Sequence, residues 1–236
     1  MSEAKETLRS RSRNAYLKHK QGKRTITLSP RKEGSDPLST ALDGKVQKFL
    51  NENRGKWRDW NVPYEDGKVL YNLIIKGGYK RALEIGTSTG HSAIWIAWAL
   101  SKTGGRLITI ENDKGRYEKA LRNLKEAGLE THVDARLSDA HQLVGKLQGP
   151  FDFVFSDADK EWYVHYFKDV DPKLLVGGCF ATHNVTDTFA GIKEFLDYVK
   201  RIPNYRTRID RSSSSGISIS CKKSDVNKQV NSMEND

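Results

Sequence analysis

The order of apolar and polar positions divides the chain into a polar start, an alternating middle and a short polar end. The two ends show almost no apolar periodicity, which is typical of chain that does not pack into a core. Apolar side chains first recur at helical spacing near residue 42, and the run 66–76, closed by Gly77-Gly78, predicts a second helix with a glycine stop. The predicted organisation is a basic, disordered arm over 1–40, one domain over 41–223 (helices over 41–79, an α/β core over 80–223) and a polar tail over 224–236.

Beyond residue 80, short apolar runs alternate with amphipathic stretches. This alternation indicates an α/β domain with a mostly parallel sheet and helices on both faces. The last two strands are joined only by a serine-rich turn, so they must pair antiparallel. Predicted strands lie at 81–85, 107–111, 132–137, 151–156, 178–182, 205–210 and 217–220, and predicted helices lie at 92–100, 114–127, 140–147, 162–170 and 188–199.

Composition and the absence of certain segments indicate the cellular compartment of the protein. No apolar stretch approaches the roughly 20 residues that span a bilayer, and the N-terminus lacks the apolar core of a signal peptide. Cys179 and Cys221 do not form a paired motif, so neither a disulfide nor a zinc site is predicted, and a reducing compartment is expected. These features predict a cytoplasmic protein with no membrane partner.

The net charge of +10 is concentrated in the arm. Residues 1–40 hold ten Lys and Arg against four acids, which accounts for +6 of the total. A basic arm can bind nucleic acid, but a solvated polar arm explains the same residues. Nucleic acid is therefore not favoured as a partner.

The turn Gly86-Thr-Ser-Thr-Gly90 follows the first strand of the predicted sheet. Ligands of such sheets bind at the carboxyl ends of the strands, and glycines let the backbone approach them closely. The G-x-G-x-x-G spacing of a dinucleotide site is absent. The turn also matches the G-x-S-x-G elbow of α/β-hydrolases, with Asp157 and His183 following in order, but Ser88 comes after the first recognisable strand and a hydrolase elbow comes deeper in its sheet.

Two acidic residues end the next strands. Glu111 lies 25 residues beyond Gly86, and a carboxylate at this strand tip can accept both hydroxyls of a ribose. Asp139, with Ser138 and Ala140, could bind an adenine edge, although a helix N-cap explains the same letters. The pattern thus favours a nucleoside-containing ligand.

Taken in order, several blocks resemble the O-methyltransferases that include catechol O-methyltransferase and caffeoyl-coenzyme A O-methyltransferase. The blocks are Trp60-Asn-Val-Pro with Asp66-Gly-Lys, Leu83-Glu-Ile-Gly-Thr-x-Thr-Gly-x-Ser92, Ile110-Glu111, Phe151-Asp-Phe-Val-Phe-Ser-Asp-Ala-Asp-Lys160, Gly177-Gly178 and Gly216-Ile-Ser-Ile. The resemblance covers roughly residues 57–221. It implies a Rossmann-like class I methyltransferase fold, with a seven-stranded sheet.

The resemblance also implies S-adenosylmethionine as cofactor and a homodimer. Ser92 would lie near the cofactor carboxylate and Glu111 on the ribose. The cofactor-binding residues that it predicts are Val62, Glu84, Gly86, Thr87, Ser88, Ser92, Glu111, Asp139, Ala140 and Asp157.

By the same resemblance Asp157 is also a ligand of a divalent metal, together with an Asp-Asn pair that ends the next strand. Here that pair is His183-Asn184. An imidazole suits magnesium or calcium poorly and a transition metal better, which favours a retained but altered metal site at Asp157, His183 and Asn184. Alternatively, no metal binds and His183 itself takes the substrate proton, or His183 is only packed at a strand end.

Lys160, in the Asp-Ala-Asp-Lys run, resembles the general base of the family, and burial beside a sulfonium would help to lower the pKa of its amine enough for that role. The predicted function is methyl transfer to a hydroxyl of a small, phenolic or catechol-like acceptor, with Lys160 and His183 as the catalytic residues. Alternatives are a nucleic-acid methyltransferase that uses the arm and a cofactor-binding module without activity. The segment 185–191 after the altered pair is short, which predicts an open acceptor pocket. Aromatic residues that could line this pocket are Trp57, Trp60, Tyr64, Trp162 and Phe189.

Overall fold

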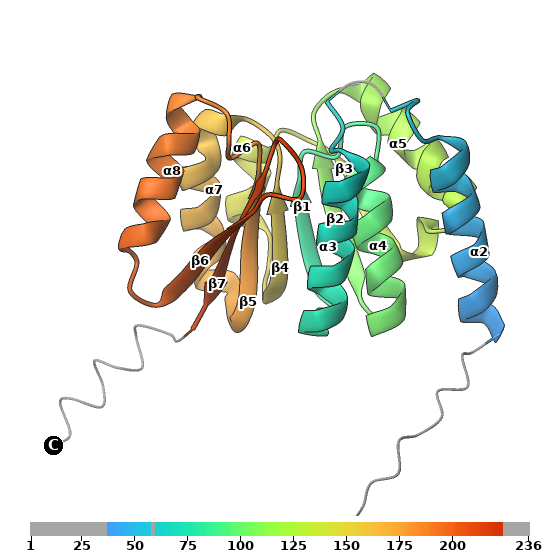
Figure 1. The fold of residues 1–236 in the computed structure, drawn as a ribbon, viewed down its shortest axis with the longest axis horizontal. Coiled ribbons are helices and arrows are strands. Elements are labelled where there is room, and N and C mark those ends of the chain that lie inside the picture. The colour runs from blue at the N-terminus through green and yellow to red at the C-terminus, as the bar shows by residue number, and fades with distance from the viewer. Residues whose placement is uncertain (1–36, 58–59, 224–236) are drawn as a thin grey trace, which may run out of the picture. The chain divides into compact units, whose positions relative to one another are not determined.

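The protein is described by a computed structural model that covers residues 37–57 and 60–223. The predicted tail and nearly all of the predicted arm lie outside these residues. A single seven-stranded sheet forms the centre, in the order β3-β2-β1-β4-β5-β7-β6 (Figure 1). Its strands are β1 (Arg81–Ile85), β2 (Arg106–Glu111), β3 (Val133–Leu137), β4 (Phe151–Ser156), β5 (Leu174–His183), β6 (Tyr205–Asp210) and β7 (Ile217–Lys222).

The strand directions explain where a site can form. β1 pairs parallel with β2 and β4, and β3 and β5 extend the parallel part on either side. β7 pairs antiparallel with both β5 and β6, which confirms the predicted antiparallel end of the sheet. From β1 the chain first adds β2 and β3 on one side of β1 and later adds β4 on the other side, so the strand order reverses at β1. Ligands of such sheets bind at this switch point, outside the carboxyl ends of the strands.

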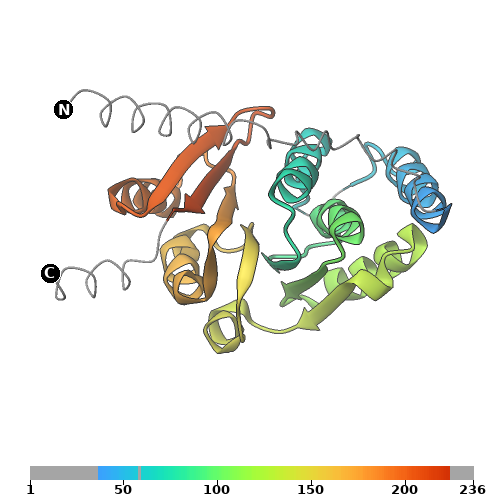
Figure 2. The ribbon, with the colours of Figure 1, turned by 90° about the horizontal axis from the view of Figure 1, so that it is seen from below.

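Helices cover both faces of the sheet (Figure 2), as the alternating pattern predicted. One apolar core packs α2 to α5 against one face, and a second core packs α7 and α8 against the other. α4 is buried from His91 to Leu100, because α3 and the sheet enclose it. The helices are α2 (Pro37–Glu52), α3 (Tyr64–Gly77), α4 (His91–Thr103), α5 (Lys114–Ala127), α6 (Ala140–Leu143), α7 (Tyr163–Val170) and α8 (Ala190–Arg201).

Two elements differ from their predicted bounds by four residues at one end, whereas the other elements with predicted bounds match them or differ by at most three residues. β5 begins at Leu174, four residues before the predicted start at residue 178. The strand continues through Gly177, which has a φ of 83°, and its pairing with β4 contains a register shift. Leu175 and Val176 are about half exposed there, so this apolar stretch forms an exposed start of the strand and not part of its buried core. α6 is a single turn that continues as a 3₁₀ turn over Val144–Lys146.

The prediction that the two cysteines do not pair is wrong. Cys179 on β5 lies directly opposite Cys221 on β7, and a disulfide joins them across 42 residues of sequence. The register of two antiparallel strands brings them together, and sequence spacing cannot reveal that register. Because disulfides are typical of oxidising compartments, the cysteines no longer support a reducing one.

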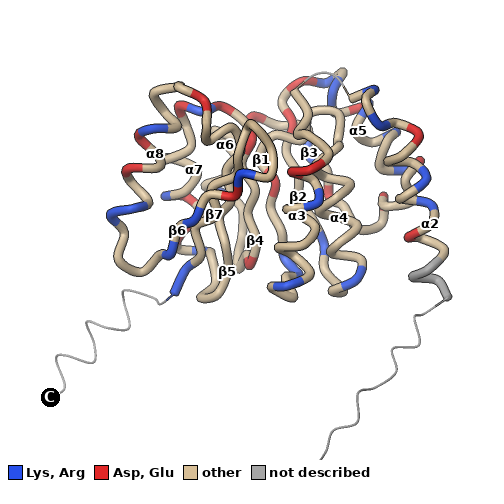
Figure 3. The backbone as a smooth tube through the Cα atoms, in the orientation of Figure 1, with Lys and Arg blue, Asp and Glu red and all other residues tan. Residues whose placement is uncertain are grey.

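The surface of the described residues gives two further facts. Lys and Arg are spread over many helices and strands and do not gather on one element (Figure 3). Within residues 37–57 and 60–223, no helix has the length and apolar character needed to cross a membrane.

Candidate functional site

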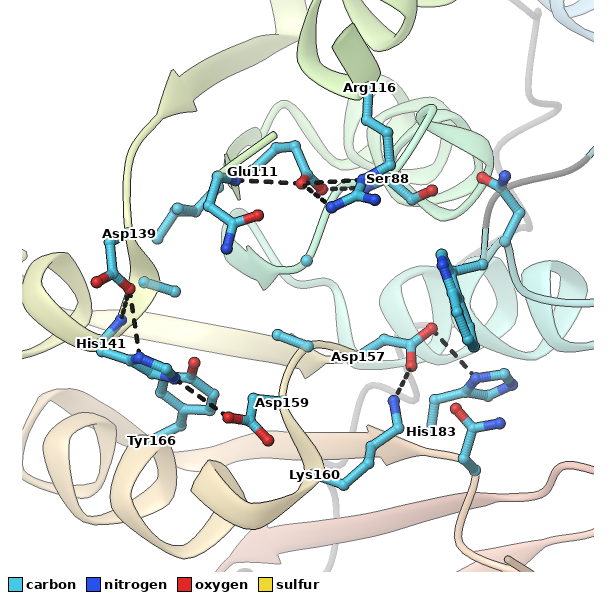
Figure 4. Close-up of a pocket in the computed structure, with 18 of the residues that line it drawn as sticks. Ser88, Glu111, Arg116, Asp139, His141, Asp157, Asp159, Lys160, Tyr166 and His183 are labelled. Carbon is cyan, nitrogen blue, oxygen red and sulfur yellow. Dashed lines mark hydrogen bonds and ion pairs between the residues drawn. The ribbon is translucent and has the colours of Figure 1, made fainter. Parts of the chain in front are cut away.

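A cavity of about 690 Å³ opens where the parallel strands end. Residues at or just beyond the ends of β1, β2, β3, β4 and β5 line it, together with the loop before α3 and the segments before α7 and α8. Such a volume lies within the range of small-molecule sites. The cavity is therefore the candidate site (Figure 4).

The turn after β1 is fixed against the end of β2. The backbone N–H groups of Gly86 and Thr87 both donate to the carbonyl of Ile110, and the N–H of Ser88 donates to Oε2 of Glu111 at 2.7 Å. Gly86 has a φ of 96°, and a Cβ there would meet the carbonyl oxygen of Asp157 at 2.7 Å. Only glycine lets the β1 turn and the end of β4 approach this closely.

Backbone strain gathers at the cavity. Among the described residues, Trp60, Ser88 and Asn184 are the non-glycine residues with left-handed φ, at 64°, 49° and 58°. All three line the cavity. Such conformations cost free energy and cluster at binding sites, so their coincidence supports a functional role for this cavity.

Glu111, at the end of β2, is 6% exposed and carries a dense set of hydrogen bonds. Its Oε1 accepts from the N–H groups of Asn112 and Asp113 and from the guanidinium of Arg116, at 3.0–3.2 Å. The carboxylate is thereby held in one orientation at the cavity wall. Its Oε2 has the backbone of Ser88 as its donor, and a carboxylate oxygen can accept a further hydrogen bond.

Asp157, just after β4, is at the centre of a second polar cluster. Its Oδ1 accepts from Nζ of Lys160 at 2.6 Å, and its Oδ2 lies 3.2 Å from Nδ1 of His183. Nε2 of His183 in turn bonds to Oδ2 of Asp66 at 2.8 Å, and Ser213 donates to the same oxygen. Figure 4 shows Asp157 between Lys160 and His183 at the cavity wall. The four side chains therefore form a row of contacts that runs from Lys160 through Asp157 and His183 to Asp66.

The pKa values in this region follow from burial and charge. Burial alone would raise the pKa of Asp157, but His183 and Lys160 outweigh it and hold this pKa below its usual value. Burial alone would lower the pKa of His183, but Asp157 and Asp66 outweigh it and raise this pKa to about 9. Glu84, fully buried beneath the β1 turn, has its pKa raised to about 8 by burial, so it is largely protonated at neutral pH.

Residues 37–192 match the model of the protein family described as O-methyltransferase. This stretch is well over half of the chain. The chain belongs to the O-methyltransferase family. The predicted resemblance and fold class are thereby confirmed, and membership argues against the hydrolase elbow as the meaning of the β1 turn.

Among curated relatives, a catechol O-methyltransferase of Niastella koreensis is 43% identical over 112 residues, which is 46% of this chain and 50% of the relative. A caffeoyl-CoA O-methyltransferase of Populus kitakamiensis is 33% identical over 145 residues, 59% of this chain and 61% of the relative. The chain thus matches about half to three-fifths of the length of these relatives.

Solved structures share the fold over most of their length. The O-methyltransferase TomG of Streptomyces achromogenes, in complex with SAM, is 26% identical with a TM-score of 0.63, and the match covers 90% of this chain and 96% of that one. An O-methyltransferase of Bacillus cereus in complex with SAH is 24% identical with a TM-score of 0.65, and the match covers 90% and 97%. At 24% identity, the similarity to the Bacillus cereus structure shows a shared fold alone.

The structure brings many of the predicted site residues together but not all. The cavity is lined by Gly86, Ser88, Glu111, Asp139, Ala140, Asp157, Lys160, His183 and Asn184. Four others are buried behind this wall, at 5% exposure or less: Val62, Glu84, Thr87 and Ser92. Asp139 also caps α6, since its side chain accepts from the N–H of His141.

Three residues of the site were missed from the sequence. Asp66 holds His183 from α3, 117 positions away, and only its place in the Asp66-Gly-Lys block hinted at a role. Arg116 pairs with Glu111 from the first turn of α5. The ring of His141 stacks on Trp162 at 3.9 Å and lies between the carboxylates of Asp139 and Asp159.

Proposed function

We propose that this protein transfers a methyl group from S-adenosylmethionine to a hydroxyl of a small phenolic acceptor. The observation that carries the proposal is the position of Lys160 and Asp157 at the wall of a cavity that Glu111 also lines, in a chain of the O-methyltransferase family. Relatives named for catechol and caffeoyl-CoA support this class of acceptor.

The donor groups of the cavity fit this cofactor. Glu111 offers an oriented carboxylate whose Oε2 can accept from a ribose hydroxyl, and Ser138 and Ala140 line the neighbouring wall where a base would lie. Asp157 offers negative charge near the β1 turn, as a bound cation such as a sulfonium requires. When bound, the cofactor supplies a methyl carbon that a nucleophilic oxygen can attack.

Lys160 is placed to take the proton of the acceptor. A hydroxyl becomes a better nucleophile as its proton leaves, and neutral Nζ of Lys160 can accept that proton. The ammonium formed is then stabilised by Oδ1 of Asp157 at 2.6 Å. The acceptor oxygen forms its bond to the methyl carbon while the electrons of the carbon–sulfur bond stay on sulfur.

Two exposed aromatic side chains at the cavity suit a flat acceptor. Trp60 is 87% exposed and Phe189 is 56% exposed, and both line the cavity. Exposure of large apolar groups at a site commonly marks the place where a ligand covers them. Of the other aromatic residues predicted for this role, Trp57 stacks on His91 and Tyr64 packs against Trp95, and neither lines the cavity.

The test is methyl transfer to catechol, a caffeoyl thioester and a flavonoid, followed by mass spectrometry. We expect turnover on at least one acceptor and a loss in kcat of roughly 10²- to 10⁴-fold in K160M, the range for a removed general base. Cofactor affinity, measured by calorimetry, should change little in this variant. K193M, which alters an exposed lysine on α8, is the matched control and should retain full activity.

Two results would overturn the proposal. Absence of S-adenosylmethionine binding at millimolar concentration removes the cofactor, and full activity of K160M removes the proposed base. The homodimer, the cytoplasmic location and the lack of a nucleic-acid partner stay predictions from the sequence, as does the division into arm, domain and tail.

A further inference from the structure

His183 is buried between two carboxylates that come from different parts of the fold. It ends β5 and is 3% exposed, whereas Asp66 lies in the first turn of α3 and is 1% exposed. The third member, Asp157, follows β4 and is 10% exposed in its side chain. Three elements therefore converge on one imidazole ring.

Each ring nitrogen of His183 faces a carboxylate oxygen. Nε2 makes a hydrogen bond of 2.8 Å to Asp66, whereas Nδ1 lies 3.2 Å from Asp157 as an ion-pair contact without hydrogen-bond alignment. A lone pair on either nitrogen would lie close to a negatively charged carboxylate oxygen and be repelled by it. The ring is therefore best accommodated with a proton on both nitrogens, as an imidazolium.

Counting charge over the cluster leads to the same state. Asp66 and Asp157 carry two negative charges, the imidazolium of His183 carries one positive charge, and Lys160 in its protonated form carries the second. The cluster is then neutral by itself, as buried charges require. With an aspartate at position 183, as in the family pattern, the same cluster would hold two excess negative charges, which is the charge that a divalent cation balances.

The donor set agrees with the charge count. Within the part of the chain that the structure describes, no group of three or more His, Cys, Asp or Glu side chains is arranged to hold a metal ion. The retained metal site predicted at Asp157, His183 and Asn184 does not fit either, because both ring nitrogens of His183 face carboxylate oxygens and leave no lone pair for a metal. Proton uptake by His183 fits no better, because both of its nitrogens already face carboxylates.

We propose that this site works without a divalent cation, and that the imidazolium of His183, bridging Asp66 and Asp157, supplies the positive charge that the family pattern assigns to a metal. His183 is then a positioning residue, since it holds Asp157 and, through it, Lys160. The inference rests on the proposed function for the role of Lys160, but metal binding can be measured without turnover.

The first experiment measures metal binding by the full-length protein. Mn²⁺ is titrated with detection by electron paramagnetic resonance and Co²⁺ with detection by visible absorption, with and without S-adenosylmethionine. We expect no site-specific binding to the wild type at millimolar metal. H183D should gain one Mn²⁺ site, whereas the matched variant H183N, which adds no charge, should gain none.

The second experiment measures methyl transfer with and without a chelator. The wild type should be unaffected by the chelator, and any activity of H183D should require added Mg²⁺ or Mn²⁺. Stoichiometric binding of Mn²⁺ or Co²⁺ to the wild type, or loss of wild-type activity on chelation, would overturn the inference. If H183D fails to fold by circular dichroism, the wild-type titration still decides. If the wild type lacks both metal and cofactor binding, the proposed function has failed and the metal result stands.

Discussion

At the residue scale, His91 shows how burial fixes a charge state. This first residue of α4 is 1% exposed, its Nδ1 lies 2.8 Å from the carbonyl oxygen of Val62, and its Nε2 accepts from the indole of Trp95. Burial is the main cause that lowers the pKa of His91 to about 4, below its usual value of 6.5. The ring is therefore neutral in the folded protein and joins α4 to the loop before α3.

This pKa predicts a loss of stability in acid. Since the folded pKa lies below the unfolded pKa, the unfolded state binds more protons between pH 6.5 and pH 4, so stability falls as the pH decreases through this window. At pH 5, this difference in the pKa of His91 lowers the free energy of unfolding by about 2 kcal/mol relative to its value at pH 8. Urea unfolding at pH 8 and at pH 5 measures how far the free energy of unfolding decreases between them. This decrease should be smaller in H91Q, which keeps a donor and an acceptor, than in the wild type. The exposed H165Q serves as control, and equal decreases in H91Q and the wild type would contradict this account.

Also at this scale, the chemistry of His183 could not be predicted from the sequence. The altered His183-Asn184 pair was visible, and it left a metal ligand, a base and a packed ring as open alternatives. The contact that distinguishes them comes from Asp66, 117 residues away, through a hydrogen bond between α3 and β5. Such a contact depends on tertiary packing, whereas Lys160 lies three residues from Asp157 and was within reach of a motif.

At the scale of elements, apolar periodicity predicted most of the fold. The bounds of α5, β1, β4 and β6 were predicted to the residue, because each is a regular run with clear ends, such as the Asp113 cap and the Gly128 stop of α5. The early part of β5 was missed because Gly177 and Gly178 interrupt the apolar run that begins at Leu174.

The disulfide between β5 and β7 has a measurable consequence at this scale. It closes a loop with a sequence separation of 42, which in the chain-entropy account stabilises the fold by about 4 kcal/mol. Reduction of the wild type, or the substitution C221A, should lower the free energy of unfolding by a similar amount, which is measured as a lower urea midpoint. A reductant should have no further effect on C221A. An unchanged midpoint in both cases would show that the bridge does not constrain the unfolded chain.

At the scale of the whole molecule, parallel topology explains why scattered motifs form one site. Residues at or just beyond the ends of β1, β2, β4 and β5 lie at one edge of the sheet, so Gly86, Glu111, Asp157 and His183 meet although the sequence separates them widely. This convergence was predictable from strand order. The residues that complete the cavity from loops, such as Trp60 and Phe189, depend on loop conformations that apolar periodicity does not determine.

Because the cavity joins the ends of five strands, a bound cofactor should stabilise the entire domain. At a concentration of about 100 times its Kd, a ligand specific for the folded state adds about 2.7 kcal/mol, which raises the Tm of a domain of this size by roughly 5 to 11 °C. Differential scanning fluorimetry with S-adenosylmethionine should show this shift in the wild type. G86A should lose it, because the added Cβ would meet the carbonyl oxygen of Asp157 at 2.7 Å. G177A shares the positive φ, at 83°, but has no atom within 4 Å of the added Cβ, so it should keep the shift and control for backbone strain. An equal shift in G86A and G177A would place the cofactor away from the β1 turn.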